Sequence, residues 1–463
     1  MMCNQFNELI TFSSMANEGK NNKLSAFGLT MVVVGACIGS GIFLSPQSVA
    51  KLIGEEQHIL WAWLIGGGVA FCGALTYSEL VGLFPKAGGI YVFLKETYGK
   101  RMAFLYGWVV LSVITSGSIA ALVIASSTYL NNLLGNPLSS GEVILLAILM
   151  IVFNTLIHVR GIKLGEIFIN TLSLLKVLGI FLLIGGGLYF LWQQFNTELV
   201  LQVEPSSKSG VSLWTGVALS MIPVMWSFGG FQHASFLAAD TKNPKRSVPF
   251  AMLAGVAFVT ICYWLCNYTY LNMLGVDGLS NSSKPAVDAM NMVVPSGGKF
   301  VSILIVISTF GSAFIFTMSA PRIYYAMSKD KVFFNWTAKT HRKYKTPANA
   351  IIVQSVWSCV LLLFWGSFEN LINYVTFIEW VFLLLAGLGV FYFRNKLPKS
   401  AYSFRLPFSY LLPSIFALVV IGFLVAVLSD GNKPALYGCI LLVVGLVVYE
   451  IFKRKNESQK LEK

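Results

Sequence analysis

Residues 28–50 read GLTMVVVGACIGSGIFLSPQSVA. The run is apolar enough to cross a membrane, yet it holds three glycines and a serine between Gly35 and Gly41. Each glycine inside a helix costs about 1 kcal/mol relative to alanine, and backbone leaves the helical form at membrane depth only where protein or a water-filled cavity surrounds it. Free amides and carbonyls at such a break suit a small charged ligand. The segment therefore predicts a carrier that binds its ligand at a half-helix.

The whole chain has the composition of a membrane protein. It has 463 residues, of which 56% are hydrophobic and 11% are charged, whereas about 25% of the residues in soluble domains are charged. Runs of about 20 apolar residues, long enough to cross a bilayer, recur along the sequence. We therefore expect an all-α membrane protein with about 12 transmembrane helices, near residues 26–50, 60–82, 102–130, 143–158, 166–192, 211–238, 249–274, 299–328, 348–366, 370–393, 409–428 and 434–453.

The basic residues are distributed unevenly between the two sides of these spans. Of the 33 Lys and Arg residues, five fall on one side (Lys51, Lys208, Lys284, Lys299 and Lys433) and Lys176 lies inside a span. The others share the opposite side with both termini, and cytoplasmic loops of membrane proteins carry such an excess. We therefore expect a cell-membrane protein with both termini in the cytoplasm. The net charge of +13 then reflects topology, and no nucleic-acid partner is expected.

A second interruption lies in the sixth predicted span, where residues 226–231 read WSFGGF. Pro223 removes a backbone donor, and Gly229 with Gly230 permits the helix to unwind. The first span runs outward across the membrane and the sixth runs inward. Two interrupted helices in halves of opposite orientation are typical of an inverted-repeat transporter.

The two breaks offer complementary groups to a ligand. Amides of residues 39–41, at the start of a half-helix, suit a carboxylate, whereas the carbonyls freed at residues 226–229 suit an ammonium group. Together they indicate a site for a zwitterion such as an α-amino acid, with Trp226 large enough to cover it. The alternative is simple helix packing through small residues, since Gly35 and Gly39 form a GxxxG pair.

Five longer motifs resemble those of a known family. They are IGSGIF (38–43), YSELVGLFPKAGGIYVFLKETYG (77–99), DTKNPKRSVP (240–249), STFGSAFIFTMSAPRIYYAMSKD (308–330) and NYVTFIEWVF (373–382). The chain resembles the amino acid–polyamine–organocation transporters, above all the L-type amino acid transporter branch and its bacterial relatives. The resemblance implies a LeuT-like fold, in which a 5+5 inverted repeat with discontinuous helices 1 and 6 precedes two peripheral helices.

The resemblance also divides the chain into regions. These are a cytoplasmic tail (1–25), a first five-helix repeat (26–192), a second five-helix repeat (211–393), two peripheral helices (409–453) and a cytoplasmic basic tail (454–463). Residues 1–25 are polar, so no cleaved signal peptide is expected. The loop 131–142 lacks a cysteine, so we expect no disulfide-linked heavy subunit of the kind found in eukaryotic heteromeric members.

The family's binding residues transfer onto the two breaks. The resemblance implies that amides around Ser40 and Gly41 bind the α-carboxylate. Carbonyls at Cys37 and Ile38, and those of Trp226, Ser227 and Gly229, would bind the α-amino group, with Trp226 as the occluding gate. The expected substrate site comprises Cys37, Ile38, Gly39, Ser40, Gly41, Ile42, Trp226, Ser227, Gly229, Gly230 and Gln232.

Two charged residues lie deep in predicted spans. Lys176 follows Glu166 by ten residues, about 15 Å along a helix, which is beyond the reach of a snorkelling lysine and marks a functional site. In sodium-independent family members the lysine at this position takes the place of a sodium ion and braces the first span. The resemblance therefore implies that Lys176 makes the chain sodium-independent. Glu379 is a candidate pocket or proton-carrying residue, with pairing to a neighbouring helix as the alternative.

Several further residues carry weaker expectations. Glu79 and Asp240 are expected to pair with loop residues such as Lys86 or Arg246 and to form an inner gate. Pocket walls are expected from Ser116, Gly117, Phe231 and Gln232, which suggest a small-to-medium neutral substrate. His233 is expected to make an interhelical hydrogen bond.

The sequence thus predicts a secondary active permease for neutral L-amino acids that works by alternating access, as an exchanger or a proton symporter. The alternative is a polyamine or other organic-cation exchanger of the same superfamily. A channel is disfavoured because no repeated pore motif is present. The four histidines are isolated, so no enzymatic centre is expected. No cofactor and no metal site are expected either. The expected partners are a small-molecule amino acid and the lipid bilayer.

Overall fold

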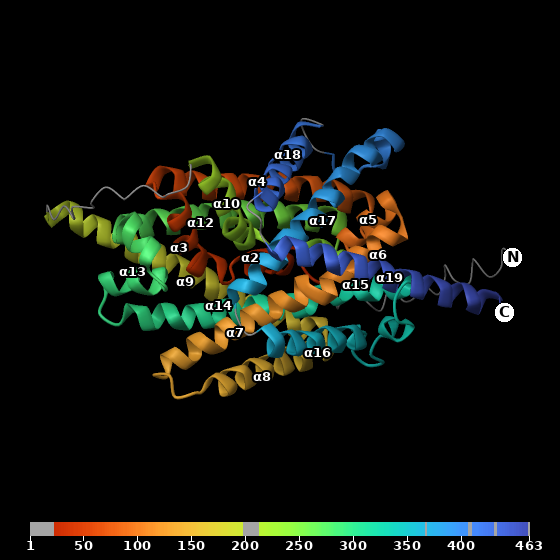
Figure 1. Ribbon diagram of the computed structural model, residues 1–463, viewed down its shortest axis with the longest axis horizontal. Helices are drawn as coiled ribbons and strands as arrows, with labels where there is room; N and C mark the ends of the chain where they lie inside the picture. Colours follow the sequence, from red (N-terminus) through yellow and green to blue (C-terminus); the bar gives the residue numbers. More distant parts are fainter. Residues whose placement is uncertain (1–22, 198–212, 366–367, 406–409, 430–432, 462–463) are drawn as a thin grey trace.

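The computed structural model describes residues 23–197, 213–365, 368–405, 410–429 and 433–461. Within these ranges the chain is helical, apart from one β-bridge that joins Leu24 to Thr241. Figure 1 shows the helices running mostly along one axis of the molecule. They are α2 (Ala26–Cys37), α3 (Gly41–Ile53), α4 (Glu56–Leu83), α5 (Ile90–Tyr98), α6 (Lys100–Val109), the π-helix η2 (Val110–Ile114), α7 (Thr115–Leu133), α8 (Ser140–Val159), α9 (Ile162–Thr197), α10 (Leu213–Phe228), α11 (His233–Phe236), α12 (Pro244–Asn281), α13 (Pro285–Val293), α14 (Gly297–Ser319), α15 (Pro321–Lys329), α16 (Ala348–Trp365), α17 (Phe368–Lys396), α18 (Leu411–Ser429) and α19 (Lys433–Leu461).

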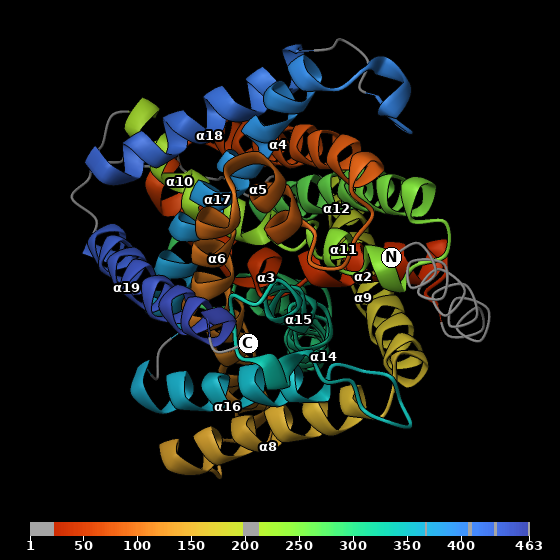
Figure 2. The same cartoon turned by 90° about the vertical axis from the view of Figure 1, so that its right-hand side faces the viewer.

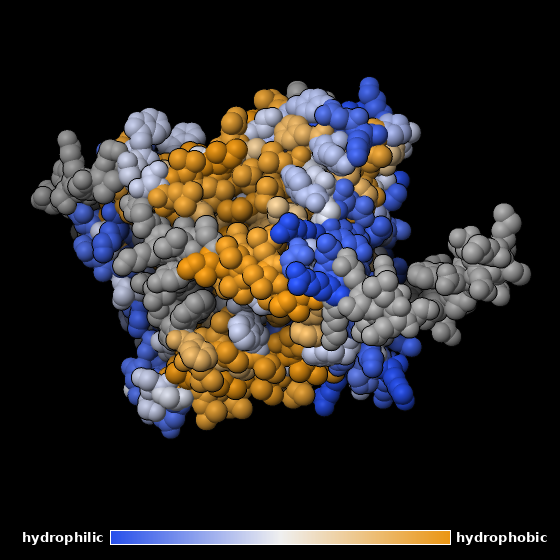
Figure 3. All heavy atoms as spheres, turned by 45° about the vertical axis from the view of Figure 1, so that its right-hand side comes forward, coloured by the Kyte–Doolittle hydropathy of each residue, from blue (hydrophilic) through white to orange (hydrophobic). Residues whose placement is uncertain are grey.

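The helices have the lengths and polarity of membrane spans. In the described part of the chain, nine helical stretches are long and apolar enough to cross a membrane. Two shorter apolar helices, Leu213–Phe228 and Ala348–Phe364, fall where further spans were predicted. Figure 3 shows a broad apolar band between two hydrophilic ends on the face in view. The described part of the chain is therefore all-helical and has the apolar helices of a multi-pass membrane protein.

The interrupted helices occupy the middle of the bundle. Figure 2 looks along the bundle and shows α2 and α3 near the centre beside α14, whereas α8, α16, α18 and α19 lie at the edge. The side chains agree with this view, because Val32, Val33 and Ile42 are fully buried. Leu149 on α8 and Leu418 on α18 are instead more than half exposed, as expected for lipid-facing helices. The two sequence interruptions therefore lie inside the protein.

Candidate functional site

The first break lies where the glycine cluster predicted it. Helix α2 ends at Cys37 and α3 begins at Gly41, so residues 38–40 leave the helix. The first amides of a helix have no acceptor within it. The amides of Gly41 and Ile42 are therefore available to a ligand, at the end of α3 where the helix dipole favours negative charge.

The second break follows α10. That helix continues through Pro223 and ends at Phe228, and α11 begins at His233. Between them Gly230 adopts a φ of 119°, a conformation that glycine reaches without strain. The last carbonyls of α10 lack donors from within their own helix. The amide of Gly229 still donates to the carbonyl of Trp226 at 3.1 Å. Unwinding therefore starts after Phe228 and not at Trp226, and the carbonyl of Trp226 is not freed.

Each break needs a glycine because the other break packs against it. A Cβ on Gly41 would lie 2.6 Å from the Cα of Ser227, and a Cβ on Gly230 would lie 2.9 Å from the carbonyl carbon of Ala36. Both distances are shorter than those that Cβ atoms make with non-bonded atoms in proteins. Gly35 instead faces α9, where a Cβ would meet the hydroxyl of Ser173. The packing alternative therefore applies to Gly35, whereas Gly41 and Gly230 hold the two breaks together.

A small cavity of about 20 Å³ lies between the breaks. Among the predicted site residues, Cys37, Gly39, Ser40, Gly41, Trp226, Gly229, Gly230 and Glu379 line it. The remaining wall consists of Ala36, Ile114, Thr115, Ser118, Leu122, His233, Ser312 and Phe316. The predicted site residues Ile38, Ile42, Ser227 and Gln232 are not among the lining residues, and neither are the expected wall residues Ser116, Gly117 and Phe231.

The wall from the third span is set by a π-helix. η2 ends at Ile114, and Ile114, Thr115 and Ser118 face the cavity in place of Ser116 and Gly117. A π-turn adds a residue to the turn and so rotates the residues that follow by about 100°. Single π-turns of this kind occur frequently at functional sites.

Three of the carbonyls expected to bind an amino group accept hydrogen bonds from side chains of other helices. The hydroxyl of Tyr263 on α12 lies 2.6 Å from the carbonyl oxygen of Cys37 and 3.1 Å from that of Ser227. The hydroxyl of Ser308 on α14 donates to the carbonyl of Ile38 at 2.9 Å. A carbonyl oxygen has two lone pairs. The carbonyl of Cys37 also accepts the amide of Gly39 at 2.7 Å, and that of Ile38 also accepts the hydroxyl of Ser312 at 3.2 Å. Of these three carbonyls, that of Ser227 therefore keeps a lone pair for a ligand. Sequence reasoning missed Tyr263 and Ser308.

Trp226 connects the two breaks through its side chain. Its indole Nε1 donates to the hydroxyl of Ser40 at 3.2 Å, and its ring lines the cavity. The side chain is half-buried. The residue predicted as a gate thus touches the residue predicted to hold a carboxylate, and a rotation of Trp226 would uncover Ser40.

Lys176 is fully buried and joins three helices. Its Nζ on α9 donates to the carbonyl of Gly35 on α2 at 2.5 Å and to the hydroxyl of Ser312 on α14 at 2.8 Å. Ser312 also donates to the carbonyl of Gly35 at 2.8 Å. In the described part of the chain Lys176 forms no ion pair with a carboxylate. The ammonium therefore occupies a cluster of carbonyl and hydroxyl oxygens, the kind of ligand set that unwound transporter helices offer to sodium.

Glu379 on α17 is held by a short relay from the second break. The amide of Gln232 donates to Glu379 Oε1 at 2.6 Å, and the backbone amide of Gly230 donates to Gln232 Oε1 at 3.0 Å. The same segment places His233 against Ser319, which gives the interhelical hydrogen bond expected for His233. Gln232 thus positions a pocket carboxylate and does not itself line the cavity.

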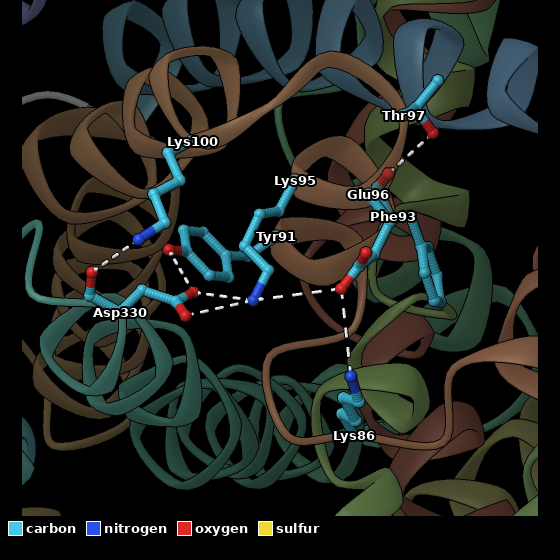
Figure 4. Close-up of polar contacts among 8 residues, drawn as sticks. All are labelled: Lys86, Tyr91, Phe93, Lys95, Glu96, Thr97, Lys100 and Asp330. Carbon is cyan, nitrogen blue, oxygen red and sulfur yellow. Dashed lines mark hydrogen bonds and ion pairs between the residues drawn. The ribbon is translucent and has the colours of Figure 1, made fainter.

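Polar contacts join α5, α6 and α15 at one end of the molecule (Figure 4). Lys95 pairs with Asp330 at 2.9 Å, and the hydroxyl of Tyr91 donates to the same carboxylate at 2.9 Å. Burial and the neighbouring Asp330 raise the pKa of Tyr91 above its usual value, so its hydroxyl stays a donor. Lys100 donates to the Asp330 carbonyl at 3.3 Å. These contacts tie α5 and α6 to the end of α15.

Two other carboxylates at this end have partners that differ from the predicted ones. Glu79 pairs with Arg394 at 2.6 Å, and both side chains are fully buried. Asp240 pairs with Arg322 at 2.9 Å. The predicted partners Lys86 and Arg246 were therefore wrong, because sequence neighbours were favoured over residues that folding brings together from other helices. The Arg322–Asp240 pair joins α15 to the segment after α11.

Comparison with known proteins gives the family. The sequence pattern of the amino acid permease family matches residues 24–448. The chain belongs to the amino acid permease family. The serine/threonine exchanger SteT of Bacillus subtilis (strain 168) is 30% identical over 440 residues, which cover 93% of this chain and 97% of SteT. This family consists of transporters, so the chain is a transporter and not an enzyme.

Two more distant relatives match over most of their length. The mouse b(0,+)-type amino acid transporter 1 is 27% identical over 424 residues, covering 91% of this chain and 86% of that protein. The human cystine/glutamate transporter is 25% identical over 426 residues, covering 91% and 83%. The resemblance drawn from the sequence motifs is thereby confirmed at the level of the superfamily.

Proposed function

We propose that this permease is a sodium-independent secondary transporter of neutral L-amino acids that works by alternating access. The observation that carries the proposal is the meeting of two helix breaks around one cavity, with Gly41 at the start of α3 and Gly229 after α10 both lining it. Amides from one break and carbonyls from the other match the carboxylate and ammonium of a zwitterion. The proposed site comprises the predicted residues Cys37, Ile38, Gly39, Ser40, Gly41, Ile42, Trp226, Ser227, Gly229, Gly230 and Gln232, of which Gln232 acts through Glu379.

The fold that this mechanism uses is part of the proposal. It has about twelve spans, with the two five-helix repeats at 26–192 and 211–393 and the peripheral pair at 409–453. Both termini lie in the cytoplasm of a cell-membrane protein, and no disulfide-linked heavy subunit is required. The α5–α15 end is then the cytoplasmic end. Its ion pairs support closure on that side in the conformation described.

Sodium independence rests on Lys176. Its ammonium fills the oxygen cluster formed by Gly35 and Ser312, so a sodium ion would have to displace a covalently attached cation. We therefore expect uptake in sodium-free buffer. The alternative substrate, a polyamine, has no carboxylate and would leave the first amides of α3 without a partner.

Exchange is the favoured mode of transport, and the similarity to SteT, a serine/threonine exchanger, supports it. The purified protein in proteoliposomes preloaded with an unlabelled neutral amino acid should take up labelled amino acid, whereas empty vesicles should take up little. If an inward proton gradient stimulates uptake of the labelled amino acid into empty vesicles, the protein is instead a proton symporter. Counterflow of putrescine but of no amino acid would contradict the proposed substrate.

A further inference from the structure

Glu379 is a carboxylate inside the proposed substrate cavity without a countercharge. In the described part of the chain no Lys, Arg or His forms an ion pair with it. Lys176 instead donates to Gly35 on α2 and to Ser312 on α14. Arg394 lies fifteen residues further along α17, about 22 Å away, and pairs with Glu79. The described part of the protein therefore supplies no countercharge to this carboxylate.

The two carboxylate oxygens of Glu379 have different surroundings. Oε1 accepts the amide of Gln232 at 2.6 Å, and Gln232 is fixed in turn by the amide of Gly230. Oε2 points to the second break, because it would lie 3.8 Å from a Cβ on Gly229. One oxygen is thus used to hold the side chain, and the other faces the lining of the cavity.

The environment of the second oxygen suits a hydrogen-bond donor. Thr115 and Ser118 on α7 also line the cavity. Their hydroxyls can donate or accept, whereas an ionised carboxylate only accepts. A polar group that enters a buried site without a partner costs about 1 to 3 kcal/mol. A ligand that supplies a donor avoids this cost, whereas a second carboxylate adds repulsion between like charges.

We infer that Glu379 selects the side chain of the substrate. The permease accepts L-amino acids whose side chains carry a hydrogen-bond donor, such as a hydroxyl or a primary amide, and rejects those whose side chains carry a carboxylate. The inference rests on the proposed function and adds to it the chemistry of the far end of the ligand. Gln232 is the positioning residue that keeps Oε1 occupied and directs Oε2 into the cavity.

Isosteric pairs of amino acids test the inference. Counterflow should be measured for threonine against valine and for glutamine against glutamate, with alanine as a reference that reports only the main-chain site. The wild type should prefer threonine and glutamine by about tenfold or more, the effect of one hydrogen bond to a charged acceptor. Glu379→Gln should reduce both preferences and admit glutamate, while alanine counterflow is retained.

Two further variants separate selection from a general defect. Gln232→Met removes the amide that holds Oε1, so it should weaken the threonine preference without removing it. Glu166→Gln removes a carboxylate that lies outside the cavity and accepts from Ser25, and it should leave both ratios unchanged.

Three results would overturn the inference. The first is Glu379→Gln with unchanged substrate ratios, even if the pH dependence of uptake is lost, because the carboxylate would then carry a proton. The second is an equal loss of all substrates, alanine included, in both Glu379→Gln and Gln232→Met. The third is a wild type that exchanges no amino acid, which would overturn the proposed function as well. Normal alanine exchange by the wild type distinguishes the first two results from the third.

Discussion

Tyr263 has one hydroxyl proton and two carbonyl acceptors, one from each break. It is fully buried, and its ring packs edge-on against Trp63 with the centroids 5.6 Å apart. Its hydroxyl reaches the carbonyls of Cys37 and Ser227 at 2.6 and 3.1 Å. A single side chain on α12 thus sets the distance between the two halves of the proposed site.

Tyr263→Phe removes this link and keeps the ring. The two carbonyls lose their shared donor, which costs about 1 to 3 kcal/mol for buried groups. We expect the substrate concentration at half-maximal uptake to rise about tenfold or more. Rates and half-saturation constants in proteoliposomes would measure the effect, with Tyr268→Phe as a control because Tyr268 lies on the same helix outside the cavity lining. An unchanged half-saturation constant in Tyr263→Phe would remove Tyr263 from the site.

Lys176→Met keeps much of the side-chain length and removes the charge. Gly35 and Ser312 then lose the ammonium that joins α9 to α2 and α14, so we expect uptake to fall about tenfold or more, equivalent to about 1.4 kcal/mol. Lys163→Met is the matched control, since Lys163 is an exposed lysine at the start of the same helix. Full activity of Lys176→Met in sodium-free buffer would show that the lysine has only a structural role.

At the scale of the elements, the two breaks depend on each other. Gly230 has a positive φ and lies against the backbone of Ala36. Gly230→Ala therefore strains the turn by about 1 to 3 kcal/mol and pushes α2 away from α10. We expect weaker ligand binding and a lower melting temperature in detergent. Gly68→Ala, at a position where a Cβ would meet nothing within 4 Å, should leave both unchanged; equal effects of the two variants would contradict the account of Gly230.

The sequence predicted these elements well because the signals are local. Small residues at membrane depth marked both breaks, and a lysine too deep to reach the interface marked the brace on α2. Contacts between distant segments left no such signal. Tyr263 lies 226 residues from Cys37, and nothing in an aromatic residue of an apolar helix indicates its partner. Ser308 and Ser312 are spaced by four residues and so lie on one face of a helix. This spacing was a sequence signal that α14 presents hydroxyls to the first break.

The π-helix shows a second limit. The sequence placed the third span correctly but suggested Ser116 and Gly117 as wall residues, whereas the structure presents Thr115 and Ser118. The register depends on η2, where the indole of Trp357 on α16 donates to the carbonyl of Ser112 at 3.0 Å. Such a turn follows from packing against another helix, so the sequence of the third span alone does not reveal which side chains face the cavity.

At the scale of the whole molecule, we propose that the contacts at the α5–α15 end keep one entrance closed. Asp330 accepts from Lys95 and Tyr91, and Asp330→Asn would weaken this closure. Cys37 lines the cavity, so labelling of Cys37 by a membrane-impermeant thiol reagent from this side reports opening. We expect faster labelling in Asp330→Asn than in the wild type. Cys37→Ala gives the background, and unchanged labelling would mean that these contacts do not hold the entrance shut.

Counterflow in sodium-free proteoliposomes tests the two-break site most directly. Vesicles preloaded with an unlabelled neutral amino acid should take up the labelled compound at the same rate with and without sodium. Gly41→Val places a branched side chain where even a Cβ would lie 2.6 Å from Ser227, and it should abolish uptake while folded protein remains in the membrane. A strict requirement for sodium would contradict a site that works without a sodium ion. Uptake retained by Gly41→Val would contradict a site built between these two breaks.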